Sequence, residues 1–287
     1  MRVIKNIPAS IRAQLLNYAK QQGRPFNEIL QYYALQRFLY RLSKSEHSKS
    51  FILKGAFLLK AWGYADNRPT MDIDLLGKTE NSEQNIVSKI RDIIETKIEP
   101  DGLVFDEASI LCEPILKEAD YTGIRVNFLC SLDTAKISIQ IDIGFGDIIT
   151  PDAVVISFPV LLKELDGPAI FAYSIETVVA EKFHAMITLG NTNSRMKDLF
   201  DVYVLLKNNK IEYKNLQKAI AVTFKKRNTV FEKNPVLFDE SYYNNENRTI
   251  MWKAFLRKMK LSADLQFPLV VKSILEQLQP IYNRLSD

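Results

Sequence analysis

Cysteine and histidine are scarce in this chain of 287 residues, which contains two of each. Cys112 and Cys130 lie in mixed apolar surroundings without the spacing of metal ligands, so we interpret them as buried thiols of a reducing compartment. His47 and His184 are also isolated, and a lone histidine is more often structural than catalytic, so we assign neither a role. These counts argue against a disulfide-stapled secreted domain and a cysteine-rich metal centre.

Long apolar runs are also missing. No segment approaches the roughly 20 apolar residues that a membrane-spanning helix needs, and residues 1–8 contain no signal-peptide core. The composition, with 47% hydrophobic and 25% charged residues, is that of an ordinary globular protein. The length suffices for one large or two modest domains. The sequence therefore predicts a cytoplasmic protein without a membrane partner.

The positive charge is concentrated in one region. Residues 195–260 contain 15 basic and 7 acidic residues, a net charge of +8, whereas the remainder has a net charge of −4. A basic region of this size indicates a polyanionic partner such as RNA. The alternative is that these side chains only solvate helix faces, and for any single lysine that alternative is preferred.

Residues 51–76 contain the most informative pattern. An apolar run is interrupted by Lys54, Gly55 and Ala56, where a short strand is expected to turn into a helix over residues 56–62. Gly55 would let the backbone approach a phosphate group closely at the start of this helix. A turn over residues 68–71 and a second strand are expected to follow.

Asp72 and Asp74 are the candidate metal ligands of that second strand. Residues two apart on a strand point to the same face, so both carboxylates project together. Neighbouring carboxylates repel each other, and a hard divalent cation, Mg²⁺ or Mn²⁺, would relieve that repulsion while also binding substrate phosphates. The alternative is that both are merely solvated strand residues.

A third carboxylate favours the metal interpretation. Residues 137–143 alternate apolar and polar side chains, as a half-buried strand does, and they contain Asp142. An acid in such a strand is costly unless it is paired or metal-bound. Asp142 could hold a second metal ion or accept the proton of an attacking hydroxyl group.

A second group of charged residues lies further along the chain. Ser174 is a credible N-cap for a helix that carries Lys182 among apolar residues, where an ammonium group requires an anion. That anion could be a triphosphate or a carboxylate of another helix. Asp198 and Asp201 lie three residues apart on a following helix, on one face, with Lys197 beside them.

The overall pattern predicts an α+β fold, in which a mixed sheet with packed helices precedes a mostly helical C-terminal domain. The boundary is placed at the turn-rich residues 164–168, which gives domains 1–165 and 166–287. The expected strands, after the two above, cover residues 103–105, 109–112, 123–129, 137–143 and 154–158. The expected helices cover about 7–20, 26–43, 83–98, 174–189, 196–206, 213–226, 247–259 and 268–278.

Together, and in this order, the motifs over residues 8–210 resemble the AbiEii/AbiGii-type nucleotidyltransferase toxins of bacteria and archaea. One departure is Ala56, where a glycine or serine is usual, so that Thr70 or backbone N–H groups would have to contact phosphate. The motifs are Leu53-Lys54-Gly55-Ala56, Arg68-x-Thr70-x-Asp72-x-Asp74, Gln140-Ile141-Asp142-Ile143-Gly144, the segment 174–182, and Arg195-x-Lys197-Asp198-x-x-Asp201.

The resemblance implies a metal-dependent transfer of a nucleotide from a nucleoside triphosphate (NTP) to cellular RNA, with tRNA 3′ ends as the best-supported acceptor. Translation would then stop, and a cognate antitoxin protein would be the second partner. The implied metal ligands are Asp72, Asp74 and Asp142. The implied catalytic residues are these three with Lys182, Asp198 and Asp201. The implied nucleotide-binding residues are Lys54, Gly55, Arg68, Thr70, Arg195 and Lys197.

Two alternatives stay open at this point. The acceptor could be a small molecule or a protein instead of RNA. The chain could also be a nucleotide-binding regulatory protein without transferase activity, which Ala56 favours.

Overall fold

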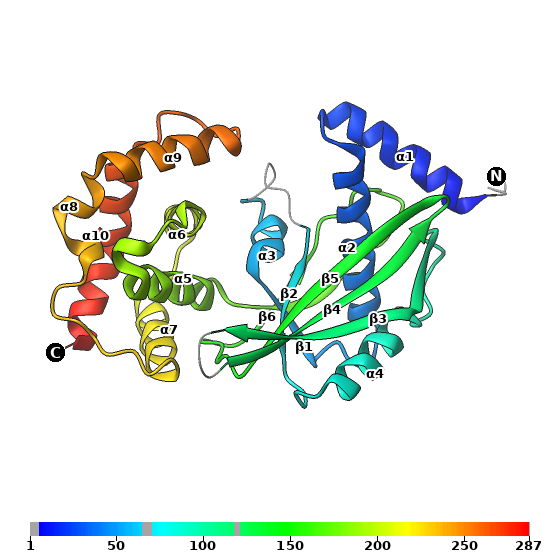
Figure 1. Cartoon of the computed structure of the whole chain (residues 1–287), viewed down its shortest axis with the longest axis horizontal. Helices are drawn as coiled ribbons and strands as arrows, with labels where there is room; N and C mark the ends of the chain where they lie inside the picture. Colours follow the sequence, from blue (N-terminus) through cyan, green and yellow to red (C-terminus); the bar gives the residue numbers. More distant parts are fainter. Residues whose placement is uncertain (1–5, 65–70, 118–120, 287) are drawn as a thin grey trace. The chain divides into compact units, whose positions relative to one another are not determined.

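The computed structural model describes residues 6–64, 71–117 and 121–286. It divides into two compact units, which we call the sheet unit and the helical unit (Figure 1). The sheet unit comprises residues 1–63, 69–146 and 154–172, and the helical unit comprises residues 64–68, 147–153 and 173–287. The main division follows Ala172 because the last short strand pairs back into the sheet beyond the turn at 164–168.

The described residues form a sheet of seven strands in the order β3-β4-β5-β2-β1-β7-β6. The pairs β2–β5 and β1–β7 are parallel and the other neighbours are antiparallel, which confirms the mixed sheet. The strands are β1 (Phe51–Lys54), β2 (Ile73–Gly77), β3 (Leu103–Lys117), β4 (Tyr121–Leu132), β5 (Ala135–Phe145), β6 (Val154–Ser157) and β7 (Ala169–Ala172).

Alternation along β5 shows how the sequence builds the two faces of this sheet. Ile137, Ile139, Ile141 and Ile143 are all buried, while the residues between them are exposed or half-buried. The apolar side packs against the helices α1 (Ile7–Gln22), α2 (Phe26–Lys44) and α4 (Glu83–Ile94). The polar side is therefore the face on which a functional site can lie.

Four helices belong to the described part of the sheet unit. The second, α2, is buried along most of its length, because it contacts the sheet as well as α1 and α4 (Figure 1). Asn6 caps the first helix by accepting a hydrogen bond from the Ala9 N–H, and Gly23 ends it at φ 60°. The helices are α1 (Ile7–Gln22), α2 (Phe26–Lys44), α3 (Gly55–Ala61) and α4 (Glu83–Ile94).

The helical unit is built around aromatic side chains. Phe183, Phe224 and Tyr282 are buried and lie with ring centroids about 6 Å apart, at separations typical of favourable aromatic pairs. Its elements are α5 (Ile175–Leu189), η1 (Gly190–Thr192), α6 (Met196–Asn208), α7 (Tyr213–Lys226), η2 (Val236–Phe238), α8 (Glu240–Tyr243), α9 (Glu246–Lys258) and α10 (Phe267–Ser286).

Some predicted boundaries are wrong for identifiable reasons. The expected strands 103–105 and 109–112 are one strand, β3, whose pairing with β4 shifts register between Asp106 and Leu111. The last helix does not end at residue 278 but continues through Pro280, because its apolar face extends to the buried Ile281 and Tyr282. Strand β7 was not expected at all.

Among the described residues, no helix is both long enough and apolar enough to cross a membrane.

Candidate active site

Five charged residues form a row across the polar face of the sheet, one from each of five adjacent strands. Glu113 is paired in register with Arg125, Arg125 with Asp142, Asp142 with Asp74, and Asp74 with Lys54. Residues paired in register project to the same face of a sheet, so these side chains are neighbours. We call this set the charged row.

Gly55 leaves room for Asp74, which lies next to Lys54 at one end of the row. It begins α3 directly after β1 and has φ +71°, in the left-handed region that favours glycine. A β-carbon on Gly55 would lie 2.0 Å from Asp74 Oδ2 and 2.6 Å from its Cγ. The sequence predicts that this glycine admits a phosphate group, whereas the structure shows that it admits the Asp74 carboxylate.

Asp72 lies in the bend immediately before β2 and is half-buried. The preceding residue is fixed by Gln31 of α2, whose Nε2 donates to the Met71 carbonyl at 3.2 Å and to the Ser138 carbonyl of β5 at 2.7 Å. Gln31 therefore ties the chain to β5 where β2 has not yet begun to pair with it. This contact sets the position from which Asp72 extends.

Asp142 is paired with Arg125. The Arg125 Nε donates to Asp142 Oδ1 at 2.8 Å and Nη2 donates to Oδ2 at 2.7 Å, which is the bidentate geometry of a strong charge-assisted pair. Gln140 Nε2 lies 3.3 Å from Oδ1. The hydrogen bond to Asp142 is the largest cause of the raised pKa of Arg125, and Asp142, Asp72 and Glu113 add to it through their charges.

The centre of the row borders a small pocket. Its lining combines the polar groups Lys54, Asp74 and Asp142 with backbone and apolar side chains from β3, β4 and β5. The complete lining is Lys54, Asp74, Ile115, Gly123, Asp142, Ile143 and Gly144. The pocket places two carboxylates and an ammonium group at one opening.

Asp72 and Asp74 fit a divalent cation, because the Asp74 carboxylate lies against Gly55 and Asp72 lies two residues before it, so two carboxylates are close along one segment. Asp142 fits less well, since Arg125 and Gln140 engage both of its oxygens. In the described part of the chain, the three acidic or histidine side chains whose ligand atoms all lie within 4.8 Å of one another are instead Glu46, His47 and Asp92.

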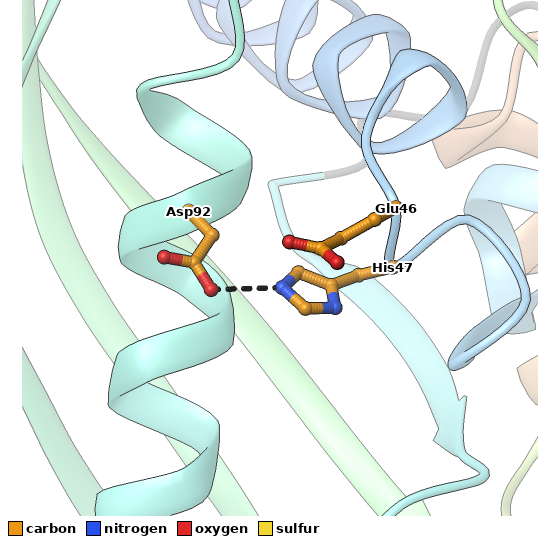
Figure 2. A group of neighbouring side chains, drawn as sticks. All are labelled: Glu46, His47 and Asp92. Carbon is orange, nitrogen blue, oxygen red and sulfur yellow. Dashed lines mark hydrogen bonds and ion pairs between the residues drawn. The ribbon is translucent and has the colours of Figure 1, made fainter.

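The Glu46–His47–Asp92 group has a simpler explanation than a metal site (Figure 2). His47 Nε2 lies 2.9 Å from Asp92 Oδ2, and Nδ1 lies 3.4 Å from the Lys89 ammonium. Lys89 can only donate, so Nδ1 accepts and Nε2 carries the proton that is donated to Asp92. Both ring nitrogens are thus used by protein groups.

The second predicted cluster lies within the helical unit. Lys182 of α5 contacts two carboxylates of α6: its Nζ lies 2.7 Å from Asp198 Oδ1 and 2.9 Å from Asp201 Oδ2. Burial alone lowers the pKa of Lys182, but Asp201 and Asp198 outweigh that effect and raise it. Of the two anions that the sequence allows for Lys182, the structure shows the carboxylates of a neighbouring helix.

Exposed cations surround this buried cluster. Arg195 is half-exposed, and its Nε lies 2.7 Å from Asp198 Oδ2, while Lys197 is exposed at the start of α6. Arg248 orders the loop before them by donating to the carbonyls of Asn191 and Asn193, both at 2.9 Å. Ser174 caps α5 as predicted, because its hydroxyl accepts a hydrogen bond from the Thr177 N–H.

Two predicted site residues, Arg68 and Thr70, lie outside the described residues. Two positioning residues, Arg125 and Gln31, were not predicted. Arg125 occupies a polar position in the alternation of residues 123–129, which is a visible signal, but its partner depends on strand register. Gln31 has no local signal, since a glutamine on an amphipathic helix is ordinary.

Comparison with solved structures shows that this fold also occurs in a protein of low sequence identity. The crystal structure of JHP933 from Helicobacter pylori superimposes with a TM-score of 0.52 at 15% sequence identity, covering 90% of this chain and 93% of that one. A second H. pylori structure, described provisionally as a nucleotidyltransferase, gives a TM-score of 0.48 at 17% identity, with 95% and 96% covered.

The family is shown by the sequence itself. Residues 37–277 match the family described as "Nucleotidyl transferase AbiEii toxin, Type IV TA system". The chain therefore belongs to the AbiEii nucleotidyltransferase toxin family, and it is a nucleotidyltransferase. No curated protein matches it.

Proposed function

We propose that this toxin transfers a nucleotide from an NTP to RNA, with the 3′ end of tRNA as the acceptor, and so blocks translation. The observation that carries the proposal is the placement of Asp74 beside both Lys54 and Asp142 in the charged row, with Asp72 two residues before it. Carboxylates beside an ammonium group suit a metal–triphosphate complex, in which the two kinds of charge are complementary.

The proposed reaction is an in-line displacement at phosphorus. The acceptor hydroxyl group loses its proton to solvent as its oxygen forms a bond to the α-phosphorus, the bond from that phosphorus to the bridging oxygen breaks, and pyrophosphate leaves. Mg²⁺ or Mn²⁺ held by Asp72 and Asp74 supplies charge neutralisation when bound. Lys54 adds a fixed positive charge at the same opening, and Gly55 keeps the Asp74 carboxylate in place.

RNA is the favoured acceptor because of the surface of the helical unit. Fourteen of the 15 basic residues between 195 and 260 are exposed, and Arg248 alone is buried. Several repeat at helical spacing, such as Lys214 and Lys218 on α7 and Lys253 and Arg257 on α9. Such faces neutralise phosphates, so binding should weaken steeply with salt.

Further residues belong to the proposal. We assign Lys182, Asp198 and Asp201 to the catalytic machinery, and Arg195 and Lys197 to nucleotide binding, together with Lys54, Gly55, Arg68 and Thr70. The exposed Arg195 shares Asp198 with Lys182, which supports a common role. The family also implies a cognate antitoxin as a partner.

The test is isotope transfer from each of the four labelled NTPs to purified tRNA, to total RNA and to protein. We expect label in tRNA only, with Asp72→Asn and Asp74→Asn inactive. Asp133→Asn is the matched control, because Asp133 is an exposed turn residue of the same unit at φ +54°, a conformation that asparagine tolerates. Label in protein, with none in tRNA or total RNA, would show that the acceptor is a protein and not RNA.

A further inference from the structure

The feature that goes beyond the family assignment is the pairing of Asp142 in the charged row. Both oxygens of this carboxylate accept hydrogen bonds from the Arg125 guanidinium, at 2.7 and 2.8 Å. Asp142 is 14% exposed and Arg125 is 38% exposed, so the pair is shielded on the carboxylate side. A bidentate guanidinium competes directly with a metal ion for the same lone pairs.

The register of the backbone keeps Arg125 beside Asp142. Arg125 and Asp142 are register partners on β4 and β5, and nine consecutive pairs of those strands are formed from Ile124 to Leu132. The arginine therefore cannot leave by a shift of one residue without turning its side chain to the apolar face. Asp142 and Asp74 are also register partners, so Arg125 and Asp74 lie on the two strands that flank Asp142.

We infer that Arg125 is a positioning residue that takes the place of a second metal ion: it engages Asp142, so the site binds one divalent cation, at Asp72 and Asp74. This inference rests on the proposed metal-dependent function. The positive charge of Arg125 is permanent, since a guanidinium group remains protonated at all relevant pH values, whereas a second metal ion would bind and dissociate.

The neighbours of Arg125 agree with this role. Asp72 acts on it electrostatically as well as Asp142, and Glu113 is its register partner on the other side. Arg125 thus lies between carboxylates of the row, where removal of its charge would leave a set of acids with no fixed cation beside Asp142. Such a set is a suitable site for a divalent ion.

The experiment counts bound Mn²⁺ per chain by electron paramagnetic resonance, with Mn²⁺ alone as the probe. We expect Asp74→Asn to bind one ion fewer than the wild type, Asp142→Asn to bind the same number, and Arg125→Gln to bind one more. In the double variant Arg125→Gln/Asp142→Asn the extra ion should be lost. Any ion at Glu46, His47 and Asp92 is common to all variants and cancels.

Arg91→Gln is the matched control, because Arg91 is an exposed arginine of the same unit whose partner is Glu107. It should leave the count unchanged, and circular dichroism checks that each variant is folded. The inference is overturned if Asp142→Asn loses an ion, or if folded Arg125→Gln gains none. If Asp74→Asn loses none, the proposed metal dependence itself is wrong, which is a distinguishable result.

Discussion

The Asp74 side chain occupies the space that a β-carbon on Gly55 would need: the position of that β-carbon lies 2.0 Å from Asp74 Oδ2. The glycine comes from the β1–α3 turn and the aspartate from β2, so one substitution at the turn displaces a proposed metal ligand on the neighbouring strand. The requirement for glycine at this position thus follows from the site as well as from the backbone.

Gly55→Ala should therefore lose at least about 100-fold in nucleotide transfer, because displacement of a reacting group by about 1 Å has effects of that size. Gly63→Ala is the control. Gly63 has φ +79°, but its β-carbon would meet nothing within 4 Å, so it experiences the backbone strain alone. Both variants should lose about 1–2 kcal/mol of unfolding free energy from that strain. Full transfer activity in Gly55→Ala would show that nucleotide transfer does not depend on the position of the Asp74 carboxylate.

Gln31→Leu should reduce transfer while leaving the sheet unit folded. The variant leaves the Met71 and Ser138 carbonyls without their donor, which costs about 1–3 kcal/mol, and it frees the chain before Asp72. Gln36→Leu is matched to it, since Gln36 is a buried glutamine of the same helix that donates to the Pro159 carbonyl. Kinetics and denaturant melts on both variants decide this. Equal losses of activity in Gln31→Leu and Gln36→Leu would show that Gln31 acts only on stability.

Lys182→Met should destabilise the protein by about 3–5 kcal/mol, because it removes the buried ammonium group that Asp198 and Asp201 share and leaves Asp198 only its contact with the more exposed Arg195. The triple variant Lys182→Met/Asp198→Asn/Asp201→Asn removes all three charges and should regain most of this stability. If the cluster is catalytic, transfer stays lost in the triple variant. Recovery of both stability and activity would reduce the cluster to a structural ion pair.

Acid should destabilise the helical unit through His184. Burial first, and then the charge of Arg227, lower the pKa of His184 from 6.5 to about 4. Between these values the unfolded chain binds a proton that the folded chain does not, so stability is lost as pH falls from about 6.5 toward 4. Thermal melts from pH 7 to pH 4.5 should decline more steeply for the wild type than for His184→Gln. Parallel declines would contradict this.

The sequence was sufficient for what local patterns determine. The alternation in β5 located Asp142, and the interruption at Gly55 located the β1–α3 turn. The pairing of Arg125 with Asp142 depends instead on the two-residue connection between Leu132 and Ala135. Its residues, Asp133 and Thr134, are not a strong hairpin signal, and a slip of one residue would reverse every side chain. Local reasoning could not fix that register.

Longer-range relations were also beyond prediction. Asp74 and Asp142 meet through a parallel pairing of β2 with β5, two strands that are separated by α4 and the long β3–β4 pair. Gln31 reaches Ser138 across more than a hundred residues of sequence. Such contacts result from packing of the whole sheet unit, so a single sequence contains no local pattern for them.

Transfer from NTP labelled separately at the α- and γ-phosphorus tests nucleotide transfer at the charged row most directly. With tRNA as acceptor, we expect α-label in the RNA, γ-label in released pyrophosphate, and neither product from Asp74→Asn. Appearance of γ-label in the acceptor, or undiminished α-label transfer by a folded Asp74→Asn protein, would contradict nucleotide transfer at this site.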